Sequence, residues 1–384
     1  MQTRVVVVGA GAFGGWTALT MLRRGAAVTL LDAWGPGNAR ASSGGETRIL
    51  RGTYGDRAVY TRMAARAMRL WREHEERSGR RFFHPIGALW IFGDDASFGE
   101  ASVEPMRAEG LSVEWLGVDE LRRRFPQVSV DDVQRALWEP EAGYALARRA
   151  CEHVVETFQA EGGDYLQMAI ASPARLGGHG LALADDTSVN ADAFVFACGP
   201  WLGPLFPDEI GELIRPTRQE TFYFGTPAGD PRWVEPQMPV WIEHGARMIY
   251  GMPGNANRGF KVADDTRGAR IDPTTMERTP DPEALARARA QLAERFPGMA
   301  RAPLVLAEVC QYENSPDGHF IVDRLGDLEN AWVAGGGSGH GFKLSPALGE
   351  HVAGLVLGTA RPIPLFNFAR LAAVRGKTST QIPR

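Results

Sequence analysis

Four residues near the N-terminus have the types and spacing that suit the binding of a dinucleotide. Gly9, Gly11 and Gly14 form a G-x-G-x-x-G motif, and Asp32 follows the last of these glycines by 18 residues. In such a motif the first glycine permits a tight turn, the second lets a pyrophosphate approach the backbone, and the third lets a helix pack closely on a strand. The acid binds a ribose hydroxyl. The motif does not distinguish FAD from NAD.

The elements expected around this motif are those that the chemistry requires. Residues 5–8 are a short apolar run, typical of a buried parallel strand. Residues 16–24 are expected to form a helix that ends at Gly25, and residues 28–31 a second strand. The pyrophosphate would then lie at the N-terminus of the helix, where free backbone N–H groups favour an anion. The sequence therefore predicts a Rossmann-type unit.

Lysine is rare in this chain, and its placement is a second chemical signal. Of the 42 basic residues only three are lysine, namely Lys261, Lys343 and Lys377. An ammonium is a compact charge whose pKa can be shifted, whereas a guanidinium is planar and stays charged, so arginine does not substitute freely for a functional lysine. Lys343 lies in a glycine-rich stretch ahead of the last expected helix. Chance placement is the alternative interpretation, and Lys377 has no assigned role.

The composition excludes several classes of protein. A net charge of −4 gives no basic footprint for nucleic acid or for an anionic membrane. The three cysteines are too widely spaced for a disulfide framework or a zinc site, so we expect no metal site and a reducing cytoplasm. The length of 384 residues fits two domains of ordinary size.

Dinucleotide-fold signals occur at both ends and in the middle of the chain, and a β-rich portion interrupts them. This pattern predicts one nucleotide-binding domain built from discontinuous pieces, with a second domain inserted. We place the boundaries of the two domains as follows: residues 1–84, 141–214 and 306–384 for the nucleotide-binding domain, and residues 85–140 and 215–305 for the substrate domain.

Four further segments carry distinctive residues. They are S-S-G-G-E-T-R-I-L-R at 42–51, Y-G-M-P at 250–253 with G-F-K at 259–261, C-Q-Y-E-N-S-P-D at 310–317, and G-H-G-F-K at 339–343. Together they make the chain resemble, nearly end to end, the FAD-dependent amine oxidases of the D-amino-acid oxidase superfamily. Within that superfamily the chain is most similar to the monomeric sarcosine oxidase and N-methyltryptophan oxidase group. The resemblance implies FAD as the cofactor. The fold class it implies is α/β, a Rossmann-type FAD-binding domain plus a β-rich substrate domain with flanking helices.

The resemblance implies roles for individual residues. Arg48 would lie by the flavin, and Arg51 would bind the substrate carboxylate together with Lys343. Tyr250 would line the substrate pocket. Lys261 would lie over the flavin ring and activate dioxygen.

A covalent cofactor is also implied, because Cys310 falls where the family bonds a cysteine sulfur to the flavin 8α-methyl carbon. An ordinary buried cysteine is the alternative interpretation. His340 would either contact the flavin or hold its own loop, and Cys198 would also suit a purely structural role. The other residues expected to contact the cofactor are Ser42, Thr47, Cys198, Gly199, Trp201, Gly337, Gly339, Gly341 and Phe342.

The implied activity is oxidation of an amino acid, in particular an N-alkylated one. Hydride would pass from the carbon next to nitrogen to flavin N5, the imine would hydrolyse, and dioxygen would be reduced to hydrogen peroxide. Three alternatives stay open: an FAD-dependent dehydrogenase, a fructosyl-amine oxidase and, outside this class, an NAD(P)-dependent dehydrogenase. A non-catalytic nucleotide-binding module is disfavoured because it would not need Lys261, Lys343 and Cys310 together. The resemblance favours a monomer.

Two positions depart from the sarcosine-oxidising members. Gly44 and Asp265 stand where those proteins have histidines near the substrate. The flavin and carboxylate machinery is untouched by these changes, but sarcosine itself is put in doubt as the substrate. A glycine at position 44 would enlarge the pocket, and Asp265, if it lines the pocket, would attract a second cationic group.

Overall fold

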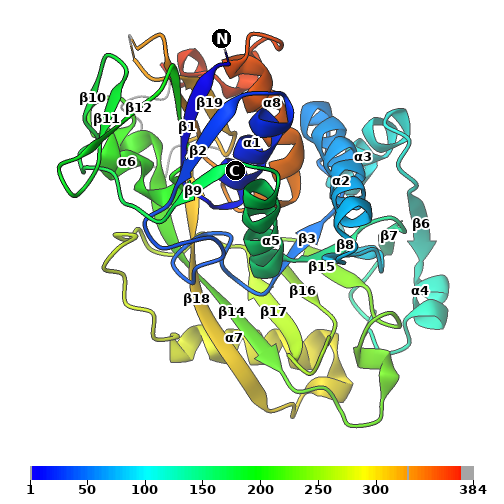
Figure 1. Ribbon diagram of the computed structural model, residues 1–384. Coiled ribbons are helices and arrows are strands. Elements are labelled where there is room, and N and C mark those ends of the chain that lie inside the picture. The colour runs from blue at the N-terminus through cyan, green and yellow to red at the C-terminus, as the bar shows by residue number, and fades with distance from the viewer. Residues whose placement is uncertain (1, 327, 373–384) are drawn as a thin grey trace.

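The computed structural model describes residues 2–326 and 328–372, and Figure 1 shows how the elements are arranged. Lys377 lies outside the described residues. A six-stranded sheet has the order β19, β20, β13, β1, β2 and β9, and all of its pairs are parallel except β19–β20. Its strands are β1 (Arg4–Val8), β2 (Ala27–Leu31), β9 (Asp164–Leu166), β13 (Ala193–Phe196), β19 (Ile321–Arg324) and β20 (Ala331–Gly335).

Helices cover this sheet, as the predicted Rossmann-type unit requires. Helix α1 (Ala12–Arg23) follows β1 and packs against α5 (Ala147–Ala160) and α8 (Ser345–Val356), and α2 (Ala58–Ser78) packs against α8. The predicted strand–turn–helix–strand order is confirmed. Helix α1 begins four residues before the predicted start, so it includes the last glycine of the motif.

An eight-stranded sheet forms the second layer, in the order β18, β14, β17, β16, β15, β5, β7 and β6. Only β15 and β5 pair in parallel. Helix α7 (Pro282–Arg295) packs against β14 and β17 on this layer (Figure 1). The strands are β5 (Ala88–Phe92), β6 (Glu114–Gly117), β7 (Arg135–Glu139), β14 (Arg215–Phe224), β15 (Val240–His244), β16 (Met248–Met252), β17 (Phe260–Asp264) and β18 (Leu304–Asn314).

Strand β18 crosses one of the expected domain boundaries. We expected the nucleotide-binding domain to resume at residue 306, but β18 pairs with β14 from Leu304 to Asn314 as an edge strand of the eight-stranded sheet. The chain therefore returns to the first layer only after residue 314. The other domain boundaries stay a prediction.

Smaller elements complete the described part of the chain. Two three-stranded sheets have the orders β3–β8–β4 and β10–β11–β12. The strands are β3 (Thr47–Leu50), β4 (Phe83–His84), β8 (Gly143–Leu146), β10 (Leu176–Gly177), β11 (Gly180–Ala182) and β12 (Ser188–Asn190), and the remaining α-helices are α3 (Ser97–Ala108), α4 (Val118–Arg124) and α6 (Leu202–Leu205). None of the helices within residues 2–326 and 328–372 is both long and apolar enough to span a bilayer.

Candidate active site

A cavity of about 330 Å³ lies where β1 and β13 end and α1 begins. It brings together most of the residues predicted to contact a cofactor, although they come from distant parts of the chain. The predicted residues on its wall are Gly9, Gly11, Asp32, Ser42, Arg48, Cys198, Gly199, Trp201, Gly337, Gly339, Gly341 and Phe342.

Glycine occurs at each of the three motif positions for a different physical reason. Gly9 has a φ of +106°, and a Cβ there would lie 2.4 Å from the carbonyl oxygen of Ala197. A Cβ at Gly14 would lie 1.7 Å from the carbonyl oxygen of Gly9, so this glycine permits the helix to pack on the turn. At Gly11 the nearest atom would be Ser43 Oγ at 3.5 Å. The protein alone therefore leaves room at Gly11, which fits the approach of a pyrophosphate to the start of α1.

The carboxylate of Asp32 holds the glycine turn in place. It accepts hydrogen bonds from the backbone N–H groups of Ala10 at 2.7 Å, Trp34 at 2.8 Å and Gly35 at 2.7 Å. Its side chain also lies on the cavity wall. Its predicted bond to a ribose hydroxyl stays a prediction.

Lys261, which lies on β17, is next to Arg48 at the start of β3. The carbonyl oxygen of Thr47 accepts a hydrogen bond from Arg48 Nη1 at 2.8 Å and from Lys261 Nζ at 3.2 Å. Arg48 Nη2 also donates to the carbonyl oxygen of Ser42 at 2.6 Å. Lys261 is buried, and its burial together with the charge of Arg48 lowers the pKa of its ammonium to about 7. Thr47 and Ser42 thus contribute their backbone oxygens to this cluster.

Arg51 and Lys343 form a second pair of cations. Arg51 Cζ lies 4.6 Å and Lys343 Nζ 5.6 Å from the ring centroid of Tyr54. Lys343 Nζ donates to the carbonyl oxygen of His340 at 3.2 Å. Among the described residues, neither cation forms an ion pair with a carboxylate. Burial, and next the charge of Arg51, holds the pKa of Lys343 well below its usual value.

Tyr250, Tyr312 and Asp265 form a hydrogen-bonded chain beside these cations. The Tyr312 hydroxyl donates to Asp265 Oδ1 at 2.8 Å, and the two tyrosine hydroxyls are 3.5 Å apart. Burial raises the pKa of Asp265, although the hydrogen bond from Tyr312 and the charges of Lys343 and Arg51 act in the opposite direction. Asp265 therefore lies within the electrostatic reach of the predicted carboxylate-binding cations.

The imidazole of His340 holds its own loop. Its Nε2 donates to the carbonyl oxygen of Gly318 at 3.0 Å, so its Nδ1 is the acceptor for the Tyr54 hydroxyl at 3.3 Å. Burial holds the pKa of His340 well below its usual value, in agreement with a neutral ring. The ring also stacks on Phe320 with a centroid distance of 4.9 Å. These bonds tie the His340 loop to Gly318 and Tyr54, and contact of His340 with the flavin stays a prediction.

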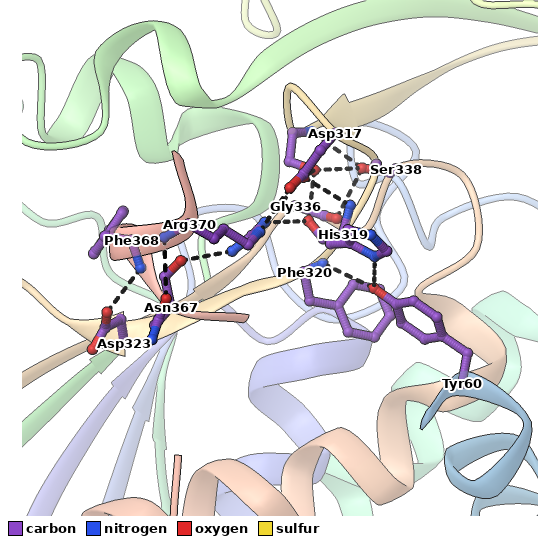
Figure 2. Close-up of polar contacts among 12 residues, drawn as sticks. Tyr60, Asp317, His319, Phe320, Asp323, Gly336, Ser338, Asn367, Phe368 and Arg370 are labelled. Atoms are coloured by element: carbon purple, nitrogen blue, oxygen red, sulfur yellow. Dashed lines mark hydrogen bonds and ion pairs between the residues drawn. The ribbon is translucent and has the colours of Figure 1, made fainter. Parts of the chain in front are cut away.

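A polar network anchors the glycine-rich loop that carries His340 (Figure 2). Arg370 donates to both carboxylate oxygens of Asp317, at 2.8 and 3.1 Å, and to the carbonyl oxygen of His319 at 3.1 Å. The His319 ring nitrogen Nδ1 is 2.9 Å from the Tyr60 hydroxyl. On the other side, the Ser315 N–H donates to Ser338 Oγ at 3.1 Å. The S-P-D segment thus links the last described residues to the loop at the cavity.

The structure places Cys310 beside the cationic cluster. Cys310 lies on β18 as a free, half-buried thiol, and it is not among the residues that line the described cavity. Burial raises its pKa, while the charges of Arg48 and Lys261 act to lower it. Its covalent bond to the cofactor stays a prediction.

Gly44 does not enlarge the pocket as we expected. A Cβ there would lie 1.9 Å from the carbonyl oxygen of Asn38 and 3.2 Å from that of Ala41. The glycine is therefore explained by a close approach of two backbone segments. A side chain at position 44 would clash with the carbonyl oxygen of Asn38, because the chain itself already fills this space.

Glu313 is a functional candidate that the sequence analysis missed. It lines the cavity from the end of β18, and its Oε1 accepts a hydrogen bond from the Gly337 N–H at 3.2 Å. Its Oε2 is buried and has no hydrogen-bond partner among the described residues. No local sequence pattern pointed to Glu313. Its place in the cavity depends on how β18 meets the glycine-rich loop in the folded chain. No group of three His, Cys, Asp or Glu side chains in the described ranges is placed to hold a metal ion.

Comparisons with known proteins identify the family of the chain. The family model for DAO, FAD dependent oxidoreductase, matches residues 4–355. The monomeric sarcosine oxidase of Bacillus sp. (strain B-0618) is 29% identical and aligns with 98% of each chain. The N-methyl-L-tryptophan oxidase of Salmonella heidelberg (strain SL476) is 27% identical over 96% of this chain and 98% of its own.

Two solved structures share the fold. The L-proline dehydrogenase of P. horikoshii has a TM-score of 0.82 at 21% identity, covering 95% of this chain and 96% of its own. The fructosyl amine:oxygen oxidoreductase (Amadoriase I) of Aspergillus fumigatus also has a TM-score of 0.82, at 19% identity, covering 99% of this chain and 93% of its own. At these identities the likeness establishes the fold.

Proposed function

The chain belongs to the DAO family of FAD-dependent oxidoreductases, and we propose that it is an oxidase of N-alkylated amino acids. The curated relatives oxidise sarcosine or N-methyl-L-tryptophan by their names, and both carry a carboxylate and a secondary amine. The overall reaction would convert the amino acid to an imine, which water hydrolyses, while dioxygen takes up two electrons and two protons to give hydrogen peroxide. FAD, when bound, supplies the acceptor for the hydride that leaves the carbon next to nitrogen.

The single observation that carries this proposal is the cation pair of Arg51 and Lys343. Both groups make cation–π contacts with the ring of Tyr54, and neither forms an ion pair with a carboxylate among the described residues. Lys343 is buried and Arg51 is half-buried, and the carboxylates of Asp265 and Glu139 act on Lys343 without forming an ion pair with it. Two such cations held together are costly unless an anion joins them. A substrate carboxylate would supply that anion through charge-assisted hydrogen bonds.

The same cations favour the reactive form of the amine. A secondary ammonium cannot release hydride from the adjacent carbon until it has lost a proton, because the nitrogen lone pair must form the imine. Fixed positive charge near the substrate lowers the pKa of its ammonium and so favours the neutral amine. Arg51 and Lys343 would therefore bind the carboxylate and promote deprotonation of the nitrogen.

The position of Asp265 favours a substrate larger than sarcosine, with a further polar group besides its amine and carboxylate. Its carboxyl is half-buried, accepts a hydrogen bond from the Tyr312 hydroxyl and lies in electrostatic reach of Lys343 and Arg51. An acid at this place favours a substrate that carries a second cationic or hydrogen-bond-donating group. This feature argues against sarcosine, which has no such group.

Lys261 supports dioxygen as the electron acceptor. Its ammonium is buried next to Arg48, so it can stabilise negative charge that develops on oxygen in a site of low polarity. A dehydrogenase that passes electrons to another acceptor would gain nothing from this charge.

The test is a panel of N-alkylated amino acids given to the purified protein under air and under argon. The proposal expects bleaching of the flavin bands by one or more secondary amino acids without oxygen, and equimolar peroxide when air is admitted. Larger substrates with a polar side chain should react faster than sarcosine. Rapid bleaching followed by negligible peroxide would instead identify a dehydrogenase, and bleaching only by NAD(P)H would contradict the assigned substrate class.

A further inference from the structure

Glu313 occupies the floor of the cofactor cavity where three glycine backbones meet. The residue is 8% exposed and is the second-last paired residue of β18. A Cβ at Gly337 would lie 2.7 Å from Glu313 Oε1, and a Cβ at Gly199 or Gly335 would lie 3.4 or 3.7 Å from Oε2. The carboxyl group is thus enclosed by the loops that follow β13 and β20. These are the loops that line the cavity.

The two oxygens of this carboxyl differ. Oε1 accepts the Gly337 N–H at 3.2 Å, whereas Oε2 is buried without a partner in the described part of the chain. No arginine, lysine or histidine among the described residues forms an ion pair with it. The titratable group that faces it from β13 is the Cys198 thiol, on which Asp32 also acts from the end of β2.

A buried carboxyl group without a cation is more stable in its neutral form. Burial raises the pKa of Glu313 to about 7. The backbone N–H groups of Gly337 and Gly336 act in the opposite direction but do not replace the water that solvates an exposed carboxylate. The neutral form also has a hydroxyl hydrogen, and Oε1 is already used as an acceptor. That hydrogen then belongs on Oε2, the oxygen that has no partner, and Glu313 is one of the residues that line the cavity.

We propose that Glu313 binds FAD as a neutral carboxylic acid, with Oε2 donating a hydrogen bond to an oxygen of the cofactor's pyrophosphate or ribityl chain. The inference rests on the flavin chemistry proposed above. The cavity includes the N-terminus of α1, where the anionic middle of the cofactor would bind, and Glu313 lines the same cavity. A carboxylate there would repel the pyrophosphate, whereas a carboxylic acid donates to it.

Cofactor binding is therefore coupled to one proton. As the pH rises above the pKa of Glu313 in the free protein, binding must first return a proton to the carboxylate. The apparent affinity for FAD should then fall by up to about tenfold for each further pH unit, or about a hundredfold between pH 7 and pH 9. Lys261 titrates in the same range, so the effect of Glu313 has to be isolated by substitution.

The experiment measures the dissociation constant of FAD for the full-length apoprotein from pH 6 to pH 9, by the change in flavin fluorescence. All proteins in this experiment carry Cys310→Ala, so that no covalent bond can mask the equilibrium. The protein with this single change is the parent for the comparisons below. Glu313→Gln keeps the shape and a donor but cannot ionise. Glu75→Gln is the matched control, since Glu75 accepts backbone N–H groups of Phe82 and Phe83 beyond the end of α2 and is not among the residues that line the cavity.

The proposal expects Glu313→Gln to bind FAD about as tightly as the parent at pH 6 and roughly tenfold to a hundredfold more tightly at pH 9. The control should follow the parent at every pH. Parallel pH profiles for the parent and Glu313→Gln would overturn the proposal. Weaker binding of Glu313→Gln at every pH would also overturn it, because it would mean that an ionised Glu313 accepts a hydrogen bond from the cofactor.

A second measurement does not depend on the folding of a Glu313 variant. Calorimetric titration of the Lys261→Met, Cys310→Ala apoprotein with FAD at pH 8, in buffers of different ionisation enthalpy, counts the protons taken up without a contribution from the lysine. The proposal expects an uptake close to one proton, and an uptake near zero would contradict it. Neither experiment involves a substrate, so either can fail while the proposed oxidase activity stands. A protein that binds no FAD at all would instead remove the basis of both.

Discussion

The ammonium of Lys261 and the guanidinium of Arg48 donate to one and the same carbonyl oxygen, that of Thr47, at 3.2 and 2.8 Å. Two cations therefore share a single neutral acceptor in a buried place. Arginine keeps its proton under these conditions, so the lysine is the group whose charge responds. This explains why burial and Arg48 bring the pKa of Lys261 to about 7. It also gives a physical reason for a lysine at this position in a chain that otherwise uses arginine.

The first prediction concerns Lys261→Met. We expect the reaction of reduced enzyme with oxygen to slow by about a hundredfold or more, because one preorganised charge is lost at the place where negative charge develops. Reduction of the enzyme by substrate under argon should change far less. Stopped-flow measurement of the two half-reactions distinguishes them, and equal slowing of both would defeat the assignment.

The same lysine predicts a pH dependence. Its pKa is lowered to about 7, so the ammonium is present below pH 7 and is lost as the pH rises through that value. The rate constant of the parent enzyme for oxygen should therefore decrease above pH 7. Lys261→Met should be slow and lack this step, and Lys261→Arg should be independent of pH in this range because its charge is permanent.

The second prediction concerns Lys343→Met. Loss of one charge-assisted hydrogen bond of about 2 kcal/mol should raise the KM for the amino acid roughly thirtyfold. The parent enzyme should lose at least a similar factor when the substrate carboxylate is replaced by an amide, and the variant should distinguish the acid from the amide less strongly, because only Arg51 remains. Arg122→Met, an exposed arginine of α4, is the control and should leave KM unchanged. Full discrimination by Lys343→Met would contradict the role in carboxylate binding.

The sequence predicted the part of the site that local pattern determines. The glycine turn, the start of α1 and Asp32 lie within one short segment, where spacing alone fixes their relation. Glu313 became visible only once the eight-stranded sheet placed the end of β18 beside the cavity. Pairing across strands so far apart in the chain is set by tertiary packing, which periodicity does not encode.

Gly44 illustrates the same limit from the opposite side. Its missing side chain suggested extra space, yet the space is filled by the carbonyl oxygen of Asn38. A glycine in a sequence does not say whether a ligand or the protein's own backbone makes the close approach. At Gly11 the same comparison favours a ligand, since the nearest protein atom is 3.5 Å from the added Cβ.

The third prediction concerns the covalent bond at Cys310. Burial raises the pKa of the thiol, and the charges of Arg48 and Lys261 beside it partly offset that effect in favour of the thiolate. After acid precipitation, we expect nearly all of the yellow colour of the parent protein in the pellet and that of Cys310→Ala in the supernatant. Cys151→Ala, which removes a buried thiol in α5, is the matched control and should keep the colour in the pellet. Colour in the supernatant of the parent would exclude the bond.

The fourth prediction concerns the ion pair between Arg370 and Asp317 (Figure 2). Burial alone would raise the pKa of Asp317, but the hydrogen bonds and charge of Arg370 lower it below the ordinary value of 3.8. A lowered pKa means that the pair stabilises the fold above about pH 4 and that this contribution is lost as the pH falls further. Arg370→Met should therefore reduce the free energy of unfolding by about 1–3 kcal/mol at pH 7 and by much less at pH 3.

Denaturant unfolding of the flavin-loaded protein at both pH values measures this effect. Arg107→Met, an exposed arginine of α3 paired with Glu104, is the control and should change the free energy by no more than about 0.5 kcal/mol. Because Arg370 holds the segment whose Ser315 and Gly318 bond the glycine-rich loop, Arg370→Met should also release flavin more readily when the Cys310 thiol is removed as well. An unchanged stability at pH 7 would show that the network in Figure 2 does not hold the glycine-rich loop in place.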